Sequence, residues 1–386
     1  MKNQFFFYAM LLGCLCSCDR LDDFIGGGGN GDDGDTNTIG SLRFIGEQII
    51  PDNTLFNGHV IGGLSGIDYA NGNYYLISDA PTAPIRFYRA TLDFDANAFT
   101  GVTVFNEVEL LTPQNDPFGE NEADPEAIRF DPKTGNILWA SEGYVDDRNV
   151  NPFIREASLS GAHLRNFNVP ALFQANPDAN AGPRNNGTFE GLSLSHDGSG
   201  FWVGMELPLI QDGPAPVFET ETDSPVRIAF IDRESGNFRK QFAYELDPVV
   251  RDGGFTVNGL VELLEYEKNK FLVLERSFAS GFDDGGNNVR IYSVDASNAT
   301  DVSSLLSLEN VDFTPATKTL LFDFESIRSQ LSTVPGSSAS IVDNIEGITF
   351  GPQLANGNRS LVVVADNNFS AFGAQLNQFI VFEVLS

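Results

Sequence analysis

Apolar and polar residues along the chain repeat a pattern of two short segments joined by a turn. The first segment of each unit alternates apolar and polar positions, the turn is rich in Gly, Asn or Asp, and the second segment is more apolar and usually ends in an acid. Alternation on both sides of a tight turn is typical of a β-hairpin. Five such units are present, and their first segments begin close to residues 64, 126, 190, 258 and 346.

Two more strand-like stretches follow most of these hairpins. They cover 86–93 and 102–111 after the first unit, 226–232 and 238–246 after the third, and 289–295 and 318–323 after the fourth. Four strands per unit, repeated along one chain, is the layout of a β-propeller blade with long loops. The sequence therefore predicts an all-β fold, a β-propeller of five four-stranded blades.

The two ends of the chain are expected to complete one blade together. A single strand-like stretch, 378–384, follows the last hairpin, and the stretch 41–50 precedes the first hairpin without a partner. If this N-terminal strand joins the last blade, the ring closes and its sheet edges are covered. Six blades are the alternative, if the long interval between Asn258 and Glu346 contains an extra one. The strongest helix signal, 324–330, also lies in this interval.

The composition narrows the classes of function. The chain has 386 residues with 53 acids against 23 Lys and Arg, which gives a formal net charge of −30. This charge excludes a nucleic-acid binder, because phosphate contacts need a basic surface. All three cysteines lie within the first 18 residues. The rest of the chain therefore has no disulfide, cysteine nucleophile or cysteine metal site, and its three histidines leave little room for a zinc enzyme.

The N-terminal residues predict export and lipidation. Lys2 precedes a short apolar run, 5–12, which is typical of a signal peptide and too short to span a bilayer. The segment 15–18 resembles a bacterial lipobox, and so does the segment 11–14. We expect lipidation of Cys18, with Cys14 as the alternative and an ordinary signal peptide as the other interpretation.

These features divide the chain into three parts. We expect a lipoprotein signal peptide at 1–17, an acidic Gly-rich tether at 18–40 and one propeller domain at 41–386. The predicted location is a bacterial cell envelope, at the outer membrane and facing the periplasm or the cell surface. Contact with the membrane would be through the lipid anchor alone.

Acids recur at equivalent places in the repeats. The position on the first strand carries Ser65, Glu126, Glu190, Asn258 and Glu346, and the end of the second strand carries Asp79, Glu142, Glu206, Glu275 and Asp366. In a propeller the first strands line the central channel, so these side chains are expected to form rings around the axis. Buried carboxylates are costly without partners. Cations could balance them, calcium in particular, or nearby arginines could: Arg86, Arg129, Arg227, Arg276 and Arg290. The acids could also simply cap strand ends.

Several runs resemble the bacterial phytase-like domain, a family also called "esterase-like activity of phytase". These runs are 189–192, 272–278 with 289–292, and 344–352 with 365–369. The resemblance extends over roughly residues 41–386. It implies a secreted β-propeller and suggests hydrolysis of phosphate or carboxylic esters. In better-known propeller phytases, clustered acids hold calcium ions that bind phosphate and activate water.

Two hypotheses follow for the function. The first is a calcium-assisted hydrolase of phosphate or carboxylic esters on the cell envelope, acting on a small anionic or ester substrate. Its candidate metal ligands are Glu126, Glu142, Glu190, Glu206, Glu346 and Asp366, and its candidate catalytic residues are Glu190, Glu346 and Arg276, the last orienting an anionic substrate. The second is a non-catalytic envelope propeller that binds a ligand or a protein partner at the same place. The sequence leaves the oligomeric state open.

Overall fold

The computed structural model describes residues 39–80, 82–176, 180–334 and 336–386. The predicted signal peptide, both candidate lipidation residues Cys14 and Cys18, and all but the last two residues of the predicted tether lie outside these ranges. Within them, no helix is long and apolar enough to cross a membrane.

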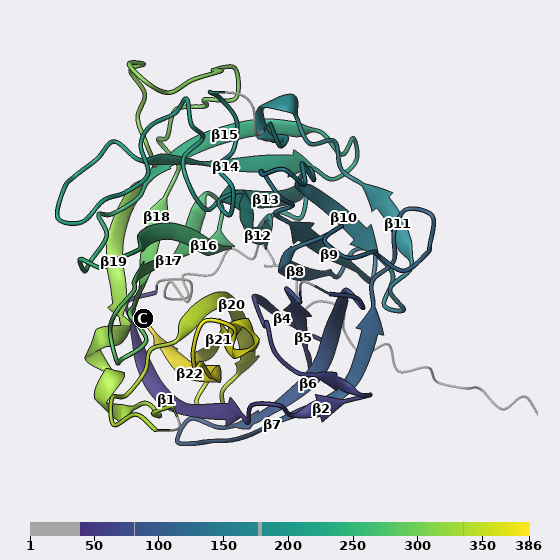
Figure 1. The fold of residues 1–386 in the computed structure, drawn as a ribbon, viewed down its shortest axis with the longest axis vertical. Coiled ribbons are helices and arrows are strands. Elements are labelled where there is room, and N and C mark those ends of the chain that lie inside the picture. The colour runs from purple at the N-terminus through teal and green to yellow at the C-terminus, as the bar shows by residue number, and fades with distance from the viewer. Residues whose placement is uncertain (1–38, 81, 177–179, 335) are drawn as a thin grey trace, which may run out of the picture. The chain divides into compact units, whose positions relative to one another are not determined.

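Five antiparallel sheets of four strands each are arranged around a common axis (Figure 1). We number the blades 1 to 5 in chain order. Blade 1 contains β4 (Gly66–Ala70), β5 (Asn73–Ser78), β6 (Arg86–Phe94) and β7 (Phe99–Glu109); blade 2 contains β8 (Pro125–Asp131), β9 (Asn136–Ser141), β10 (Phe153–Ala157) and β11 (His163–Asn166); blade 3 contains β12 (Phe189–Leu194), β13 (Gly200–Met205), β14 (Pro225–Asp232) and β15 (Phe238–Glu245). The first strand of each blade is the innermost and the last is the outermost.

The remaining elements complete the ring and its loops. Blade 4 contains β16 (Thr256–Glu267), β17 (Lys270–Ala279), β18 (Asn287–Asp295) and β19 (Thr317–Asp323), and blade 5 contains β20 (Asn344–Gln353), β21 (Arg359–Asp366), β22 (Asn377–Leu385) and β1 (Ser41–Ile50). A small hairpin, β2 (Leu55–Phe56) with β3 (His59–Val60), precedes blade 1, and short 3-10 turns occur at η2 (Ala171–Phe173) and η5 (Asn368–Ser370). The predicted five-bladed propeller is confirmed.

The ring closes as the sequence predicted. Strand β1 pairs antiparallel with β22, from Ser41 opposite Leu385 to Ile50 opposite Asn377. The N-terminal strand thereby forms the outer strand of the last blade. A closed ring holds together the first and last segments of the domain and covers an edge that would otherwise be free to pair with another chain.

The structure of the segment between Asn258 and Glu346 differs from two expectations. It holds β18 and β19 of blade 4 and no further sheet among the described residues, so the six-bladed alternative is wrong. The helix expected at 324–330 is replaced by two 3-10 turns, η3 (Phe324–Ser326) and η4 (Arg328–Gln330). Asp323 caps the first turn by accepting a hydrogen bond from the Glu325 amide, and Ile327 interrupts the helical dihedrals with φ −114° and ψ −4°. Burial of Phe324 and Ile327 fixes these turns against the neighbouring strands.

Aromatic side chains fill the space between neighbouring blades. Trp202 of blade 3 packs against Phe271 of blade 4 with ring centroids 5.4 Å apart, and against Phe230 and Phe242 of its own blade at 5.1 and 5.5 Å. Large rings suit the wedge-shaped gap between twisted sheets because each buries a large apolar area. This packing accounts for the high phenylalanine content of the chain.

Candidate functional site

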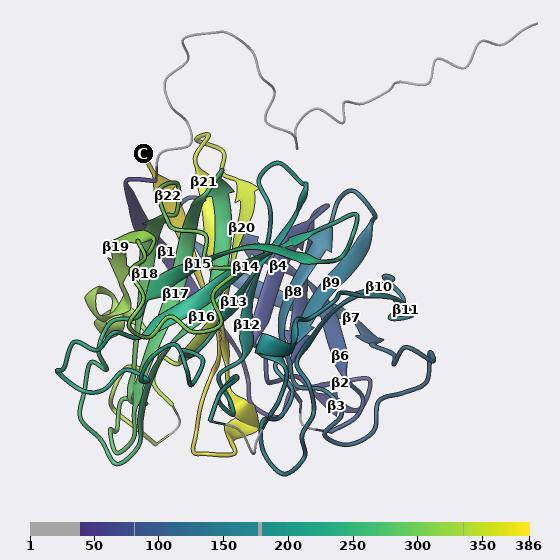
Figure 2. The ribbon, with the colours of Figure 1, turned by 90° about the horizontal axis from the view of Figure 1, so that it is seen from above.

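In each blade the first strand and the second strand are antiparallel neighbours, so the start of the first and the end of the second lie at the same end of the central axis. Figure 2 shows this end below: the η5 segment that follows β21 lies there, opposite the β20–β21 turn. Acids at the start of inner strands and at the end of second strands are therefore brought to one end of the ring. We call this set the acidic ring; its members are Asp79, Asp124, Glu126, Glu142, Glu190, Glu206, Glu346 and Asp366.

A β-bulge marks the inner-strand acid in three blades. Pro125 pairs with Ser141 and Ala127 with Ala140, which leaves Glu126 as the extra residue of β8. The same shift of register leaves out Glu190 in β12 and Glu346 in β20. A bulge re-aims one side chain and is a recurring device beside functional sites. The shared bulge shows that these three acids are placed by one structural rule.

The glycine after the acid lets neighbouring inner strands approach. A Cβ atom on Gly191 would lie 3.0 Å from the Leu263 backbone nitrogen, and one on Gly347 would lie 3.0 Å from that of Ile67. A larger residue would push the blades apart at the axis. In blades 3 and 5 the Glu-Gly pair thus combines a re-aimed carboxylate with a tight inner ring, whereas Glu126 in blade 2 is followed by Ala127.

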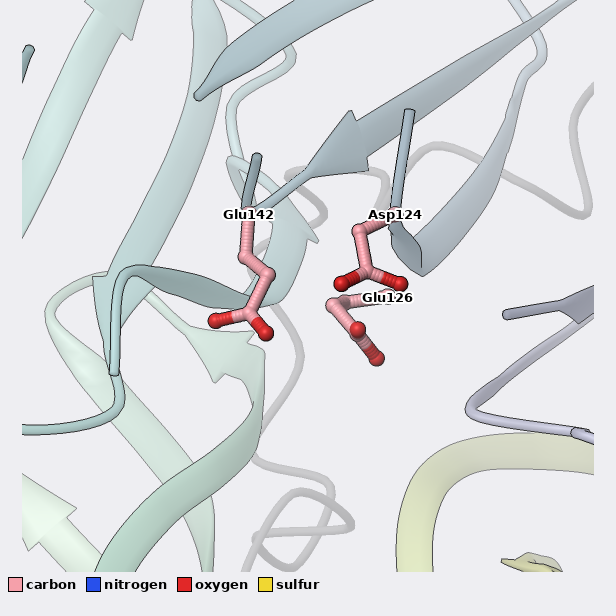
Figure 3. Close-up of side chains that lie close together, drawn as sticks. All are labelled: Asp124, Glu126 and Glu142. Carbon is pink, nitrogen blue, oxygen red and sulfur yellow. The ribbon is translucent and has the colours of Figure 1, made fainter. Parts of the chain in front are cut away.

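Three carboxylates converge in blade 2 (Figure 3). Asp124, Glu126 and Glu142 each offer an oxygen atom, and these atoms all lie within 4.8 Å of one another. The Glu142 amide donates a hydrogen bond to the Asp124 carbonyl at 3.0 Å, which ties the end of β9 to the start of β8. We call this set the three-carboxylate group. Asp124 is absent from the predicted ligands, although it lies two residues before Glu126, a spacing that favours one face of a strand.

Several ring carboxylates have no hydrogen bond or ion pair in the described part of the chain, among them those of Asp79, Glu126 and Glu190. Glu126 is 8% exposed and Glu190 is 5% exposed, and neither accepts a hydrogen bond or forms an ion pair there. One oxygen of Glu206, Oε2, is also buried without a partner. Glu142 accepts a long hydrogen bond, 3.4 Å, from the Thr188 amide. Buried carboxylates without partners are energetically costly, and binding of protons or cations would lower this cost.

One arginine lies among the acids. Arg276 of β17 places Nη2 3.3 Å from Glu206 Oε1 and 3.2 Å from Glu346 Oε1. No other Lys, Arg or His of the described residues comes within 4.0 Å of a ring carboxylate. Although burial lowers the pKa of Arg276, Glu346 and Glu206 raise it overall. The guanidinium therefore stays charged and balances only a small part of the ring.

The two ring acids of blade 5, Glu346 and Asp366, accept hydrogen bonds from neutral polar groups. Asn344 donates to Glu346 Oε1 at 2.9 Å and to Asp366 Oδ2 at 3.4 Å. The Asn368 amide donates to Asp366 Oδ1 at 2.7 Å. Asp366 thus accepts hydrogen bonds from the residues around it, while Asn367 caps the following turn η5.

Burial raises the pKa of every carboxyl group in the ring, and repulsion by neighbouring carboxylates adds to this in all but Asp124 and Glu206. Desolvation raises the pKa of Asp124 to about 6, of Glu206 to about 7 and of Glu346 to about 8. For the others, desolvation and then a neighbouring carboxylate raise the pKa well above its ordinary value; these groups are Asp79, Glu126, Glu142, Glu190 and Asp366. The direction is the same throughout because the positive charge nearby is insufficient.

Arg129 points away from the acidic ring and makes a separate cluster on the axis. Its guanidinium donates to backbone carbonyls of all four other inner strands: Ile67 of β4, Leu192 of β12, Leu263 of β16 and Ile348 of β20. Its Nη2 also lies 2.7 Å from Glu262 Oε2. We call Arg129 with these partners the arginine hub. It joins the five blades and does not neutralise the predicted metal ligands.

The other predicted arginines and one acid also have structural partners. Arg86 donates to the Tyr88 hydroxyl, Arg227 pairs with Asp212, and Arg290 donates to Asp323. Glu275 lies outside the ring: it was expected at the end of a second strand, but β17 continues to Ala279. It accepts hydrogen bonds from the Tyr244 hydroxyl, Lys318 Nζ, Asn258 Nδ2 and the Asp247 amide. Glu275 is thus balanced by side chains and a backbone amide of its surroundings.

The first residue of the inner-strand set also has a structural role. Ser65 donates its hydroxyl to the Pro125 carbonyl at 2.9 Å, which ties blade 1 to blade 2 next to the three-carboxylate group. Of the ten residues at the two repeat positions, seven therefore reach the acidic ring. Ser65, Asn258 and Glu275 serve the fold.

The chain belongs to the phytase-like family, described as "Esterase-like activity of phytase", whose model matches residues 59–369. This confirms the resemblance drawn from the sequence. No curated protein matches the chain.

Solved propeller structures are similar to the chain at low identity. An endo-arabinase from Bacteroides thetaiotaomicron VPI-5482 has 11% identity and a TM-score of 0.45, with 88% of this chain and 97% of that chain covered. An endo-1,4-beta-xylanase from the same organism has 11% identity and a TM-score of 0.44, with 83% and 90% covered. At this level of similarity the names of these enzymes carry no argument about the activity of the chain.

Proposed function

We propose that this phytase-like propeller hydrolyses phosphate or carboxylic esters with the help of a calcium ion held by Asp124, Glu126 and Glu142. The observation that supports this most is the three-carboxylate group, in which ligand atoms from two adjacent strands lie within 4.8 Å of one another and Glu126 has no other partner among the described residues. Family membership supports an ester as the substrate class.

The residues present fit a calcium ion. Calcium prefers oxygen ligands at 2.3–2.6 Å, and two ligands on opposite sides of such an ion are about 4.8 Å apart. The donors are all hard carboxylate oxygens, with no cysteine or histidine among them. An ion at this place would also offset the repulsion that raises the pKa values of Glu126 and Glu142. When bound, calcium would polarise the ester oxygen and favour ionisation of a water molecule.

The chain itself would contribute proton transfer and exclusion of water. Glu190 is buried and has no hydrogen bond or ion pair among the described residues. Burial and then the charges of Glu142 and Glu206 raise its pKa. Its raised pKa means that it holds a proton at a pH where an ordinary glutamic acid has lost it, so Glu190 could protonate the leaving alcohol. Glu346 lies beside Arg276 and is the second candidate for this role. The arginine hub fills the axis behind the acids.

The envelope location is part of the proposal. The predicted signal peptide at 1–17, the predicted lipidation of Cys18 and the predicted tether would attach the enzyme to a bacterial outer membrane by lipid. Such an enzyme would meet esters outside the cytoplasm.

The test is an ester screen with the purified full-length chain. Phytate, p-nitrophenyl phosphate and p-nitrophenyl acetate are incubated with calcium and with excess chelator, and the variant Glu126→Gln is compared with Glu309→Gln, an exposed acid away from the ring. We expect hydrolysis that needs calcium, is lost in Glu126→Gln and is retained in Glu309→Gln. Undiminished turnover in chelator would refute the proposal. Saturable binding of these compounds without turnover would favour the non-catalytic alternative.

A further inference from the structure

The acidic ring has two parts that differ in how their charge is balanced. The three-carboxylate group has no Lys, Arg or His within 4.0 Å among the described residues. On the other side, Glu206 and Glu346 share a single nitrogen of Arg276. Burial raises the pKa of Glu190, and charges of both parts act on it: Glu142, Glu206 and Glu346 raise this pKa and Arg276 lowers it. We call Glu190, Glu206 and Glu346 the Arg276 side of the ring.

Arg276 contacts the ring carboxylates through a single nitrogen, as a simple cation would, and not through a two-pronged pair. A structural arginine in this molecule looks different: Arg227 forms a two-pronged pair with Asp212, with Nε 2.6 Å from Oδ2 and Nη2 2.9 Å from Oδ1. In contrast, Arg276 uses one nitrogen for two carboxylates at 3.2–3.3 Å, and its Nε is buried without a partner. Its planar fork, which distinguishes arginine from a simple cation, is not used in pairing with these acids.

The surrounding backbone places Arg276 between the carboxylates. Gly259 of β16 is opposite Arg276 in the ladder of blade 4. A Cβ atom on Gly259 would lie 2.5 Å from Glu206 Cγ, so the glycine leaves the space through which Glu206 reaches the arginine. The Leu260 amide donates to the Glu206 carbonyl at 3.1 Å and fixes this approach across blades 3 and 4.

The carboxylates of the Arg276 side retain free binding capacity. Glu190 is 5% exposed and has no hydrogen bond or ion pair in the described ranges. Glu206 Oε2 is buried without a partner, while its other oxygen faces Arg276. Glu190 and Glu206 thus both have oxygen atoms that no described residue engages. Such oxygens are the ligands that a divalent cation takes.

We propose that Arg276 is a built-in substitute for a second divalent cation, so that the acidic ring binds one calcium ion, at the three-carboxylate group, and keeps the Arg276 side closed to metal. This inference rests on the proposed function for the first ion. Arg276 would then set the number of ions, and loss of its charge would open a second site formed by Glu190, Glu206 and Glu346.

The test counts bound calcium in three forms of the full-length chain. Wild type, Arg276→Met and Arg276→Lys are saturated with calcium, passed through a desalting column and analysed by elemental mass spectrometry, with calorimetric titration as a second count. We expect one ion in wild type, two in Arg276→Met and one in Arg276→Lys, because lysine restores a point charge. In Arg276→Met, further substitution of Glu206→Gln and Glu346→Gln should return the count to one.

Each outcome separates this inference from the proposed function. One ion in both wild type and Arg276→Met would overturn the role of Arg276 and leave the first site intact. Two ions in wild type would also overturn it. No ion in any form would refute both proposals.

A second readout applies if the methionine variant folds poorly without calcium. The rise in the thermal unfolding midpoint between chelator and calcium should be larger for Arg276→Met than for wild type, because a second ion binds only the folded state. An equal rise in the two proteins would contradict the inference. The lysine variant should match wild type.

Discussion

The acidic ring and the arginine hub are two buried charge clusters on the same axis, and they are balanced in opposite ways. In the hub, one guanidinium meets carbonyls from every other inner strand and the carboxylate of Glu262. Among the described residues, the ring has eight carboxyl groups and one guanidinium within 4.0 Å of any of them, that of Arg276, which contacts Glu206 and Glu346. Buried charge is compatible with a stable fold when its partners are built in. The ring lacks such partners, which is why it is the place to expect a ligand.

A single strand contributes to both clusters. Glu126 and Arg129 lie three residues apart on β8, one unpartnered among the described residues and the other with its donors engaged. Residues of the same buried strand can therefore serve stability or function, depending on whether other blades supply partners. Substitutions in the two clusters should accordingly have opposite effects on stability.

The largest effect is expected in the hub. Arg129→Lys should lower the free energy of unfolding by about 3 kcal/mol, because an ammonium group cannot reach the set of carbonyls that the guanidinium joins and leaves several buried acceptors unpaired. Urea unfolding followed by circular dichroism measures this. Calcium should not restore the loss, and a decrease below about 1 kcal/mol would show that the hub is not a main source of stability.

The pH dependence of stability should show the uncompensated ring. In chelator, the free energy of unfolding should fall by on the order of 2 kcal/mol between pH 5 and pH 8, because the pKa values of Glu206 and Glu346 are raised in the folded protein to about 7 and about 8. Between the unfolded and the folded pKa the native state holds more protons, so stability declines as the pH rises. Urea titrations at several pH values measure the slope.

The double variant Glu206→Gln and Glu346→Gln provides the control for that slope. It should flatten the decline but not abolish it, because burial also raises the pKa of Glu262 in the hub to about 8. A wild-type stability that is constant or rises over this range would contradict the raised pKa values in the ring.

Loss of charge in the three-carboxylate group should stabilise the metal-free protein. The double variant Glu126→Gln and Glu142→Gln removes two like charges that lie close together and should raise the free energy of unfolding in chelator by about 1 kcal/mol. The same variant should lose the stabilisation that calcium gives to wild type. Thermal unfolding with chelator and with calcium measures both, and a destabilised variant in chelator would mean that these acids support the fold.

The smallest effect is expected from Arg276→Lys. A lysine can supply the same point charge to Glu206 and Glu346, so the free energy of unfolding should change by less than about 0.5 kcal/mol. The comparison with Arg129→Lys uses one substitution at two arginines and one urea assay. Equal losses at both positions would remove the distinction between a hub arginine and a ring arginine.

Most of the fold could be predicted from local patterns in the sequence. Period-two alternation and turn residues located 41–50 as the closing strand, which the structure has as β1 with the same bounds. They also placed Glu126, Glu190 and Glu346 on inner strands, where they were expected to form a ring around the axis. The helix expected at 324–330 failed because capping by Asp323 and burial of Phe324 favour tight 3-10 turns there.

Only part of the candidate site could be predicted from the sequence. Asp124 joins Glu126 and Glu142 through the pairing of β8 with β9, and the bulge that re-aims Glu126 has no signature in the alternation. Glu275 has the same repeat position as Glu142 but leaves the ring, because Tyr244 of blade 3 and Lys318 of β19 supply it with partners. Equivalent positions in a repeat thus share a location and not necessarily a role.

The sequence by itself determined the repeat, the strands, the closure of the ring and the recurrence of acids at equivalent places, because these follow from local patterns along the chain. Only the tertiary structure decided which charges are balanced. Arg129 finds the Ile348 carbonyl 219 residues away, and Arg276 finds Glu206 70 residues away. Such pairings depend on how five separate sheets meet at the axis. They turn the chain's excess of acids into a stable hub at one place and an uncompensated acidic ring at another.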